Sequence, residues 1–298
     1  MKQLPFLNDA AGHRVAVDPR RPAIIVPVQA TAPEEIARQC RAITDTGVVD
    51  VIEWRIDPVL ASIAEECCAG SRAAAPQEFA EAVLGLAAHV STAGLPVLIT
   101  LRTGFEGGSA DVSEDVYTEI LTTIITGLSE SSGLSESSGL SESSGLSGAS
   151  GPAIPTAGTT WALDVEIDRR GAAELIDMAH DRGLSVVASH HNFARTDSAE
   201  VLGATFTRMA AAGADVAKIA MMPGTRADVA ELLRATALAE EALAVPVLGI
   251  SMGQLGRTSR VMGADFGSCA TFAQLGESSA PGQIAVADLA GIVDRLYG

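Results

Sequence analysis

The sequence predicts an α/β protein with a (β/α)8 TIM barrel, formed by a single domain over residues 1–298. Short, continuously apolar runs rich in β-branched residues alternate along the chain with longer amphipathic segments rich in Ala and Glu. Continuous apolar strands are typical of parallel strands that are buried on both faces. A doubly wound open sheet is the alternative fold, but no Gly-x-Gly-x-x-Gly motif follows any early strand.

The expected elements follow in order, each strand being a β-branched run such as Ala-Ile-Ile-Val-Pro-Val or Leu-Ser-Val-Val-Ala-Ser. Strands are expected at 23–28, 49–54, 97–101, 160–165, 184–189, 215–220, 246–251 and 268–272. Segments with the apolar period of a helix lie at 34–46, 77–94, 113–126, 170–183, 197–212, 225–242, 253–263 and 284–297. Residues 1–20 precede the first strand, and we expect an N-terminal hairpin there that closes the bottom of the barrel.

Residues 127–159 break this alternation. Gly-Leu-Ser-Glu-Ser-Ser occurs three times from residue 127, followed by Gly-Leu-Ser-Gly-Ala-Ser and a stretch rich in Pro, Gly and Thr. A repeat this polar buries too little apolar surface to offset the entropy of ordering it. We therefore predict a flexible, low-complexity insert between the third helix and the fourth strand, on the bottom face of the barrel and without a catalytic role.

Composition narrows the class of protein. The formal charge of −17 argues against nucleic acid or an anionic membrane as partner, because both are bound by basic surfaces. The four cysteines show no Cys-x-x-Cys spacing, no signal peptide is evident, and no apolar stretch is long enough to span a bilayer. We expect a cytoplasmic protein that needs no cofactor and no metal, since no His, Cys, Asp and Glu set has metal-ligand spacing.

Lys218 is one of two lysines among the 20 basic residues, and it lies in the apolar run Asp215-Val216-Ala217-Lys218-Ile219-Ala220. An ammonium group in a buried strand loses hydration, which makes the nucleophilic free amine accessible. Such a lysine suits Schiff-base chemistry. The alternative to a catalytic role is that Lys218 is a lysine left by chance in an arginine-rich composition and is held by an ion pair.

Other polar residues follow the expected strands, where barrel active sites form. Glu53 and Arg55 share one face of the second strand, as a structural ion pair or as site residues, and Arg102 and Glu106 lie on a glycine-rich loop after the third. Asp164 and Glu166 share a face of the fourth strand and are candidates to support the site. His190 and His191 end the fifth strand and point to opposite faces, so one of them can lie beside Lys218 as a base.

Near the C-terminus, Arg260 follows the seventh strand, and Ser279-Ala280-Pro281-Gly282-Gln283 follows the eighth. A cation and hydrogen-bond donors suit a carboxylate or hydroxyl groups. A Pro-Gly turn before the last helix is the structural alternative.

Together these segments resemble the type I 3-dehydroquinate dehydratases over nearly the whole chain from about residue 22 to 297, apart from the insert. The resemblance rests on Val51–Arg55, Thr100–Arg102 with Glu106–Gly108, Ser189–Phe193, Gly213–Ala220, Ser251–Met252 with Ser259–Arg260, and Ser279–Gln283. It implies a lyase, usually a homodimer, that dehydrates 3-dehydroquinate to 3-dehydroshikimate in the shikimate pathway of aromatic amino acid biosynthesis, without a cofactor or metal.

The resemblance also implies residue roles. Lys218 matches the imine-forming lysine, His191 rather than His190 the proton-transferring histidine, and Glu106 the carboxylate that orients it. Residues that match substrate-binding positions are Glu53, Arg55, Arg102, Arg260, Ser279 and Gln283. Two positions depart from the family pattern, Pro27 where Ser is frequent and Asn192 where Asp is common. A class I Schiff-base aldolase and a catalytically inert barrel that acts as a binding module are the alternative functions.

Overall fold

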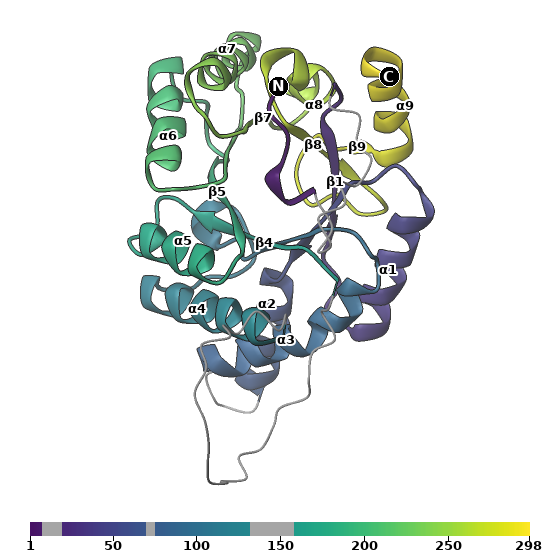
Figure 1. Ribbon diagram of the computed structural model, residues 1–298, viewed down its shortest axis with the longest axis vertical. Coiled ribbons are helices and arrows are strands. Elements are labelled where there is room, and N and C mark those ends of the chain that lie inside the picture. Colours follow the sequence, from purple (N-terminus) through teal and green to yellow (C-terminus); the bar gives the residue numbers. More distant parts are fainter. Residues whose placement is uncertain (8–19, 70–74, 132–157) are drawn as a thin grey trace, which may run out of the picture.

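Parallel strands close into a barrel, and helices cover its outside (Figure 1). The computed structural model describes residues 1–7, 20–69, 75–131 and 158–298. The barrel strands are β1 (Ala23–Val28), β2 (Val51–Arg55), β3 (Val97–Thr100), β4 (Trp161–Glu166), β5 (Ser185–Asn192), β6 (Val216–Met221), β7 (Val247–Ser251) and β8 (Ala270–Gln274). The helices are α1 (Pro33–Asp45), α2 (Asp57–Ala69), α3 (Pro76–Ser91), α4 (Glu114–Ser131), α5 (Ala172–Asp181), α6 (Ala199–Ala211), α7 (Arg226–Ala242), α8 (Arg257–Met262) and α9 (Val286–Tyr297).

From β1 to β7 each strand pairs in parallel with the next, and β1 also pairs with β8. Between β7 and β8 the barrel is closed by the amide of Cys269, which donates to the carbonyl of Val247 at 2.9 Å. The register places Ser189 of β5 beside Lys218 of β6. Because side chains alternate along a strand, Ser189 and His191 share one face of β5. The predicted TIM-barrel fold is confirmed.

The interior of the barrel and its outer shell form two apolar clusters. Side chains such as Ile25, Val51 and Leu98 fill the barrel, and Leu4, Phe6 and Leu7 pack against this inner cluster. The larger cluster joins the outer faces of the strands to the helices. The N-terminal residues therefore plug the barrel, as expected, although Pro5–Leu7 form a 3-10 turn (η1). The rest of the expected hairpin, residues 8–19, lies outside the described residues.

The elements depart from the sequence expectations most clearly at three places. Helix α2 was not expected, since its apolar residues spread around the helix instead of forming one stripe. Helix α4 continues through residue 131, into the first copy of the repeat, because Leu128 extends the helical apolar pattern of Leu121, Ile124 and Ile125 and is buried. The last expected helix is preceded by a two-residue strand, β9 (Ile284–Ala285), which pairs with β8. The remainder of the predicted insert, residues 132–157, lies outside the described residues.

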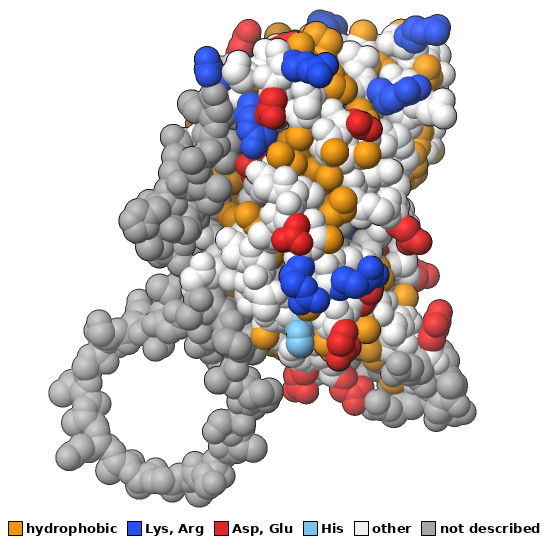
Figure 2. Space-filling model, turned by 90° about the vertical axis from the view of Figure 1, so that its right-hand side faces the viewer, with side chains coloured by type: hydrophobic (Ala, Val, Ile, Leu, Met, Phe, Trp, Pro, Cys, Tyr) orange, Lys and Arg blue, Asp and Glu red, His pale blue; other side chains and the backbone are white. Residues whose placement is uncertain are grey.

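The face of the molecule that carries α1 and α9 shows charged side chains of both signs scattered around apolar ones (Figure 2). No helix among the described residues is long and apolar enough to cross a bilayer.

Candidate active site

A pocket lies at the carboxyl ends of the barrel strands, with about 510 Å³ of empty space that includes its opening to solvent. It is lined by every residue that the sequence analysis assigned to the site: Glu53, Arg55, Arg102, Glu106, His191, Lys218, Arg260, Ser279 and Gln283. Residues 230 positions apart in the chain, Glu53 and Gln283, thus meet because the barrel closes. The lining also includes apolar side chains such as Ile250, Met252 and Phe272.

Lys218 lies at the base of this pocket, and only 3% of the residue is exposed. Its Nζ atom is 3.5 Å from Glu53 Oε1 and 3.5 Å from Asp164 Oδ2. The ring of Phe272 lies 4.6 Å from Nζ on another side. Two carboxylates and an aromatic face therefore surround the amine, while the pocket leaves it accessible to a small molecule.

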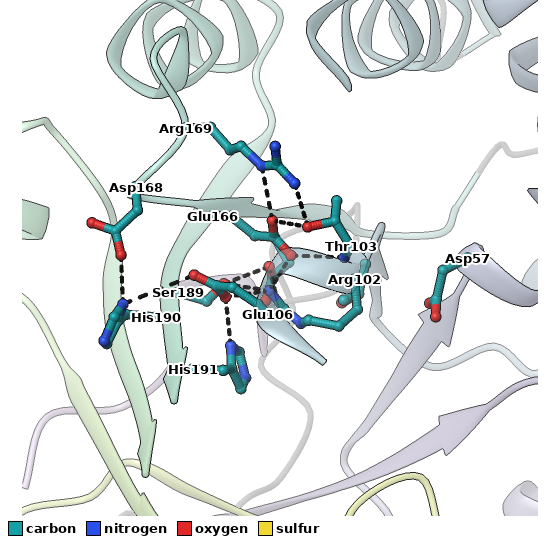
Figure 3. Close-up of polar contacts among 12 residues, drawn as sticks. Asp57, Arg102, Thr103, Glu106, Glu166, Asp168, Arg169, Ser189, His190 and His191 are labelled. Atoms are coloured by element: carbon teal, nitrogen blue, oxygen red, sulfur yellow. Dashed lines mark hydrogen bonds and ion pairs between the residues drawn. The ribbon is translucent and has the colours of Figure 1, made fainter. Parts of the chain in front are cut away.

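His191, which is partly buried, and the buried Glu106 form a pair in the pocket that holds the lysine. The Nδ1 atom of His191 lies 2.8 Å from Glu106 Oε2 (Figure 3). Glu106 Oε2 as the acceptor at Nδ1 favours the tautomer with hydrogen on that atom, which leaves Nε2 with its lone pair. Burial raises the pKa of Glu106 well above 4.5, which opposes the ionised form of this carboxyl group. Burial and the charges of Arg102 and Lys218 hold the pKa of His191 well below 6.5. The ring is therefore neutral at pH 7 and able to accept a proton.

The turn that carries Glu106 depends on two glycines. Gly107 adopts φ +80°, and a Cβ atom on it would meet the ring of Phe193 at 2.4 Å. A Cβ atom on Gly108 would meet the carbonyl oxygen of Arg102 at 1.9 Å. These positions require glycine for close packing, so the glycine-rich loop serves to direct Glu106 toward β5.

His190 faces away from the pocket, as expected for the neighbour of His191. Its Nδ1 atom lies 2.6 Å from Asp168 Oδ2, and Arg208 donates to the other oxygen of Asp168. The same Nδ1 atom is 3.9 Å from Glu106 Oε1, so Glu106 lies between the two histidines (Figure 3). The sequence analysis placed the histidines on opposite faces but did not reveal this shared neighbour.

Arg102 is the centre of a buried polar network. Its NH1 group donates to Glu106 at 2.9 Å and Glu166 at 2.9 Å, and its NH2 group donates to Asp164 at 2.8 Å. Glu166 in turn accepts from the backbone amide and hydroxyl of Thr103 and from Arg169. The arginine thus holds three carboxylates, one on its own loop and two on β4.

Arg55 is positioned by a residue that the sequence analysis did not single out. Asp57 binds the guanidinium of Arg55 with both oxygens, at 2.7 Å each. Asp57 also accepts from the amide and the hydroxyl of Ser109. Glu53 pairs with Lys218, so the Glu53–Arg55 ion pair considered from the sequence does not form. The spacing Arg-x-Asp was the available signal for this pair.

Arg260 supplies an unneutralised cation to the pocket. Its guanidinium donates to the carbonyls of Pro281 at 3.0 Å and Phe272 at 3.5 Å, and its Nε atom is buried without a partner. Within the described residues no carboxylate pairs with it. Burial lowers the pKa of Arg260 to about 10, which leaves it charged at pH 7. An anion that enters the pocket would find this charge uncompensated.

Ser279 and Gln283 lie on the loop between β8 and β9. The Gln283 amide donates to Ser279 Oγ at 3.0 Å and accepts from the Ser279 backbone amide at 3.0 Å. Both residues line the pocket, so this pair adds a hydroxyl and an amide group to its wall.

The two departures from the family pattern lie outside the pocket lining. Pro27 lines a second hollow, between α1 and Leu275–Glu277. Asn192 Oδ1 accepts from the amides of Ala194 at 2.9 Å and Arg195 at 3.2 Å, so its side chain shapes the loop after β5.

One group of possible metal ligands occurs among the described residues. Candidate ligand atoms of Glu106, Asp168 and His190 all lie within 4.8 Å of one another. His190 Nδ1 and Asp168 Oδ2 are already joined by a hydrogen bond, which a metal ion would have to displace. That the enzyme needs no metal stays a prediction.

Comparisons of this sequence with known proteins find one family over most of the chain. The model of the type I 3-dehydroquinase family matches residues 24–130 and 158–297. The chain is 32% identical to 3-dehydroquinate dehydratase of Lactiplantibacillus plantarum over 271 residues, 90% of each chain. It is 30% identical to that of Listeria monocytogenes over 298 residues, 98% of this chain and 99% of the relative.

Solved structures agree. The dehydratase of Geobacillus kaustophilus has a TM-score of 0.72 and 28% identity, with 92% of this chain and 91% of that chain covered. The type I enzyme of Clostridium difficile with covalently modified comenic acid has a TM-score of 0.71 and 27% identity, with 93% of both chains covered. This chain therefore belongs to the type I 3-dehydroquinase family.

Proposed function

We propose that this enzyme dehydrates 3-dehydroquinate to 3-dehydroshikimate through an imine between the substrate ketone and Lys218. Family membership makes the chain a 3-dehydroquinate dehydratase, a lyase of the shikimate pathway. The observation that carries the imine route is the buried amine of Lys218 at the base of a pocket that also holds a neutral histidine. An imine draws electrons from the neighbouring carbon, and so acidifies its C–H bond.

We assign the two proton transfers that follow to His191. The neutral ring removes the proton from the carbon next to the imine, and the imidazolium then protonates the hydroxyl that leaves as water. Glu106, 2.8 Å from Nδ1, holds the ring in one orientation and stabilises its charged state. The imine is finally hydrolysed, which releases the product and restores Lys218.

The remaining pocket residues bind the substrate in this proposal. Arg260 holds the substrate carboxylate, since it is a cation without an acidic partner among the described residues, and Ser279 and Gln283 hydrogen-bond beside it. Glu53, Arg55 and Arg102 surround the opposite end, where the ring hydroxyls lie. Arg102 reaches the pocket while its nitrogens hold Glu106 and Asp164.

The alternative functions have less support. A class I aldolase would use the same lysine chemistry with a phosphate site after β7 and β8, where this pocket presents one arginine and the Ser279–Gln283 pair. A catalytically inert barrel would not require Lys218, His191 and Glu106 to meet in one pocket, as they do here.

Borohydride trapping tests the proposed route. Incubation with 3-dehydroquinate and borohydride should add the mass of the reduced substrate to the intact protein, and peptide mapping should place it on Lys218. Without borohydride, the absorbance of the enone product should rise. If neither the adduct nor the product forms, the proposal fails. An adduct that forms only with a phosphorylated aldehyde would favour the aldolase.

As the pH is lowered, kcat should begin to fall only below pH 6.5. Only the neutral form of His191 accepts a proton, and burial holds its pKa well below 6.5. Activity is therefore retained as the pH falls through 6.5 and is lost only when the pH passes through the lowered pKa. A kcat profile from pH 4 to pH 9 checks this. A half-maximum above pH 6.5 would contradict the assigned environment of His191.

We also infer that the protein is a single-domain, cytoplasmic homodimer. The thiols of Cys40 and Cys269 are unpaired, and burial raises their pKa to about 11 and about 12, so they are suited to a reducing compartment.

Exposed apolar side chains, Met262 on α8 and Leu296 on α9, suit the subunit interface of the inferred homodimer. Light scattering at micromolar concentration distinguishes a dimer from a monomer.

A further inference from the structure

Asp164 is a buried carboxylate that has no role in the reaction steps proposed above. It lies on β4, is fully buried, and does not line the pocket. Its Oδ1 atom accepts hydrogen bonds from Arg102 at 2.8 Å and from the Ser189 hydroxyl at 2.7 Å. Its Oδ2 atom is buried and has no hydrogen bond, yet lies 3.5 Å from Lys218 Nζ. One oxygen is thus anchored, and the other is directed at the amine.

We propose that Asp164 accepts the proton that the Lys218 ammonium must lose before its nitrogen can attack the ketone. The inference deepens the proposed function and rests on Lys218 as the imine-forming residue. An ammonium group has no lone pair, so imine formation requires a proton acceptor within reach of Nζ. The 3.5 Å separation belongs to the enzyme without substrate, and such contacts shorten in the reacting complex.

Glu53 is the competing acceptor, because Lys218 Nζ donates a hydrogen bond to its Oε1 atom at the same 3.5 Å distance. Glu53 lines the pocket and therefore lies on the side from which the substrate approaches. Asp164 lies behind Nζ, outside the pocket lining, where a proton can leave without obstructing the attack on the carbonyl carbon. The position of Asp164 also excludes water from the transfer, since its residue is 0% exposed.

The resting charge state fits this role. Burial raises and the charges of Arg102 and Lys218 lower the pKa of Asp164, with a net lowering. The group is therefore ionised before the reaction, which is the form that can take a proton. The same guanidinium binds Glu106 through NH1 and Asp164 through NH2. Arg102 therefore positions both the carboxyl group beside His191 and the carboxyl group beside Lys218.

Protons balance in this step. The ammonium proton moves to Asp164 Oδ2, and the freed lone pair forms the C–N bond while the carbonyl electrons move to oxygen. One N–H proton passes to the oxygen, and Asp164 then returns its proton to the neutral nitrogen. A second N–H proton passes to the resulting hydroxyl group, which leaves as water. The sum converts an ammonium and a ketone to an iminium and water, and Asp164 ends as the carboxylate beside the iminium.

Asp164→Asn tests the role, because the amide oxygen can still accept from Arg102 and Ser189. We expect imine formation at saturating 3-dehydroquinate, measured by rapid borohydride quench and intact mass, to slow by about 100-fold. A role as counter-ion alone predicts the opposite sign, since loss of the negative charge favours the neutral amine. Imine formation at the wild-type rate or faster would overturn the proposal.

Two further variants separate chemistry from structure. Asp164→Glu keeps a carboxylate near Nζ and should form the imine faster than Asp164→Asn at equal thermal stability. Ser189→Ala removes one anchor of Asp164 and should slow imine formation by about threefold to tenfold, which provides the test if Asp164→Asn does not fold. An unchanged rate in Ser189→Ala would count against the proposal. Wild-type protein that forms no adduct would overturn the proposed function itself, whereas a normal adduct with a fully active Asp164→Asn overturns only this inference.

Discussion

Lys218→Ala should lose turnover by at least about 10⁴-fold while it still binds 3-dehydroquinate. The variant removes the nucleophile, so no imine forms and the C–H bond of the ketone is not acidified. Binding should persist because Arg260 lies on α8 and Ser279 and Gln283 lie on the loop after β8, away from β6. Product absorbance and borohydride trapping measure the first effect, and calorimetric titration measures the second.

Lys218→Arg is the matched control for this prediction. It keeps a cation beside Glu53 and Asp164, but a guanidinium stays protonated and does not form imines. It should therefore be as inactive as Lys218→Ala and trap no adduct. Turnover above about 1% of wild type in either variant would show that the lysine is not the nucleophile.

His191→Ala should form the imine and then stall. Loss of the general base and acid is expected to lower kcat by about 10³-fold, within the usual range for such groups. Because Lys218 is intact, most of the enzyme should accumulate as the imine during turnover. The trapped fraction measured by intact mass should therefore rise while the rate of enone formation falls.

His190→Ala is the neighbouring control. His190 bonds to Asp168 and does not line the pocket, so kcat should stay within about tenfold of wild type. If His190→Ala accumulates the imine and His191→Ala does not, the assignment of the two histidines is reversed.

The strands could be predicted from sequence because each is a short apolar run with a local signature. The period of two also places His190 and His191 on opposite faces, and the resemblance points to His191 as the base. Helix α2 escaped prediction, since its burial comes from packing against α3 and not from a clear apolar stripe. The helical end of α4 was obscured by the repeat, whose first copy supplies the buried Leu128.

The polar network was not accessible from sequence. Arg102 binds Glu166 and Asp164, which are 64 and 62 positions further along the chain, so no local spacing marks the contacts. The resemblance implies that Arg102 is a substrate ligand. The structure places Arg102 in the pocket lining and adds hydrogen bonds from its guanidinium to protein groups. Asp57 was likewise hidden, since its importance lies in the bidentate bond to Arg55. Such contacts follow from closure of the barrel.

The guanidinium of Arg260 has a practical consequence for measurements on this enzyme. A buried cation without a carboxylate partner among the described residues attracts any small oxyanion that fits the pocket. Phosphate, sulfate and citrate buffers would then act as competitive inhibitors, and the apparent KM would rise with their concentration. Assays in zwitterionic buffers with chloride as the counter-ion avoid this competition, and kinetic comparisons among variants belong in those conditions.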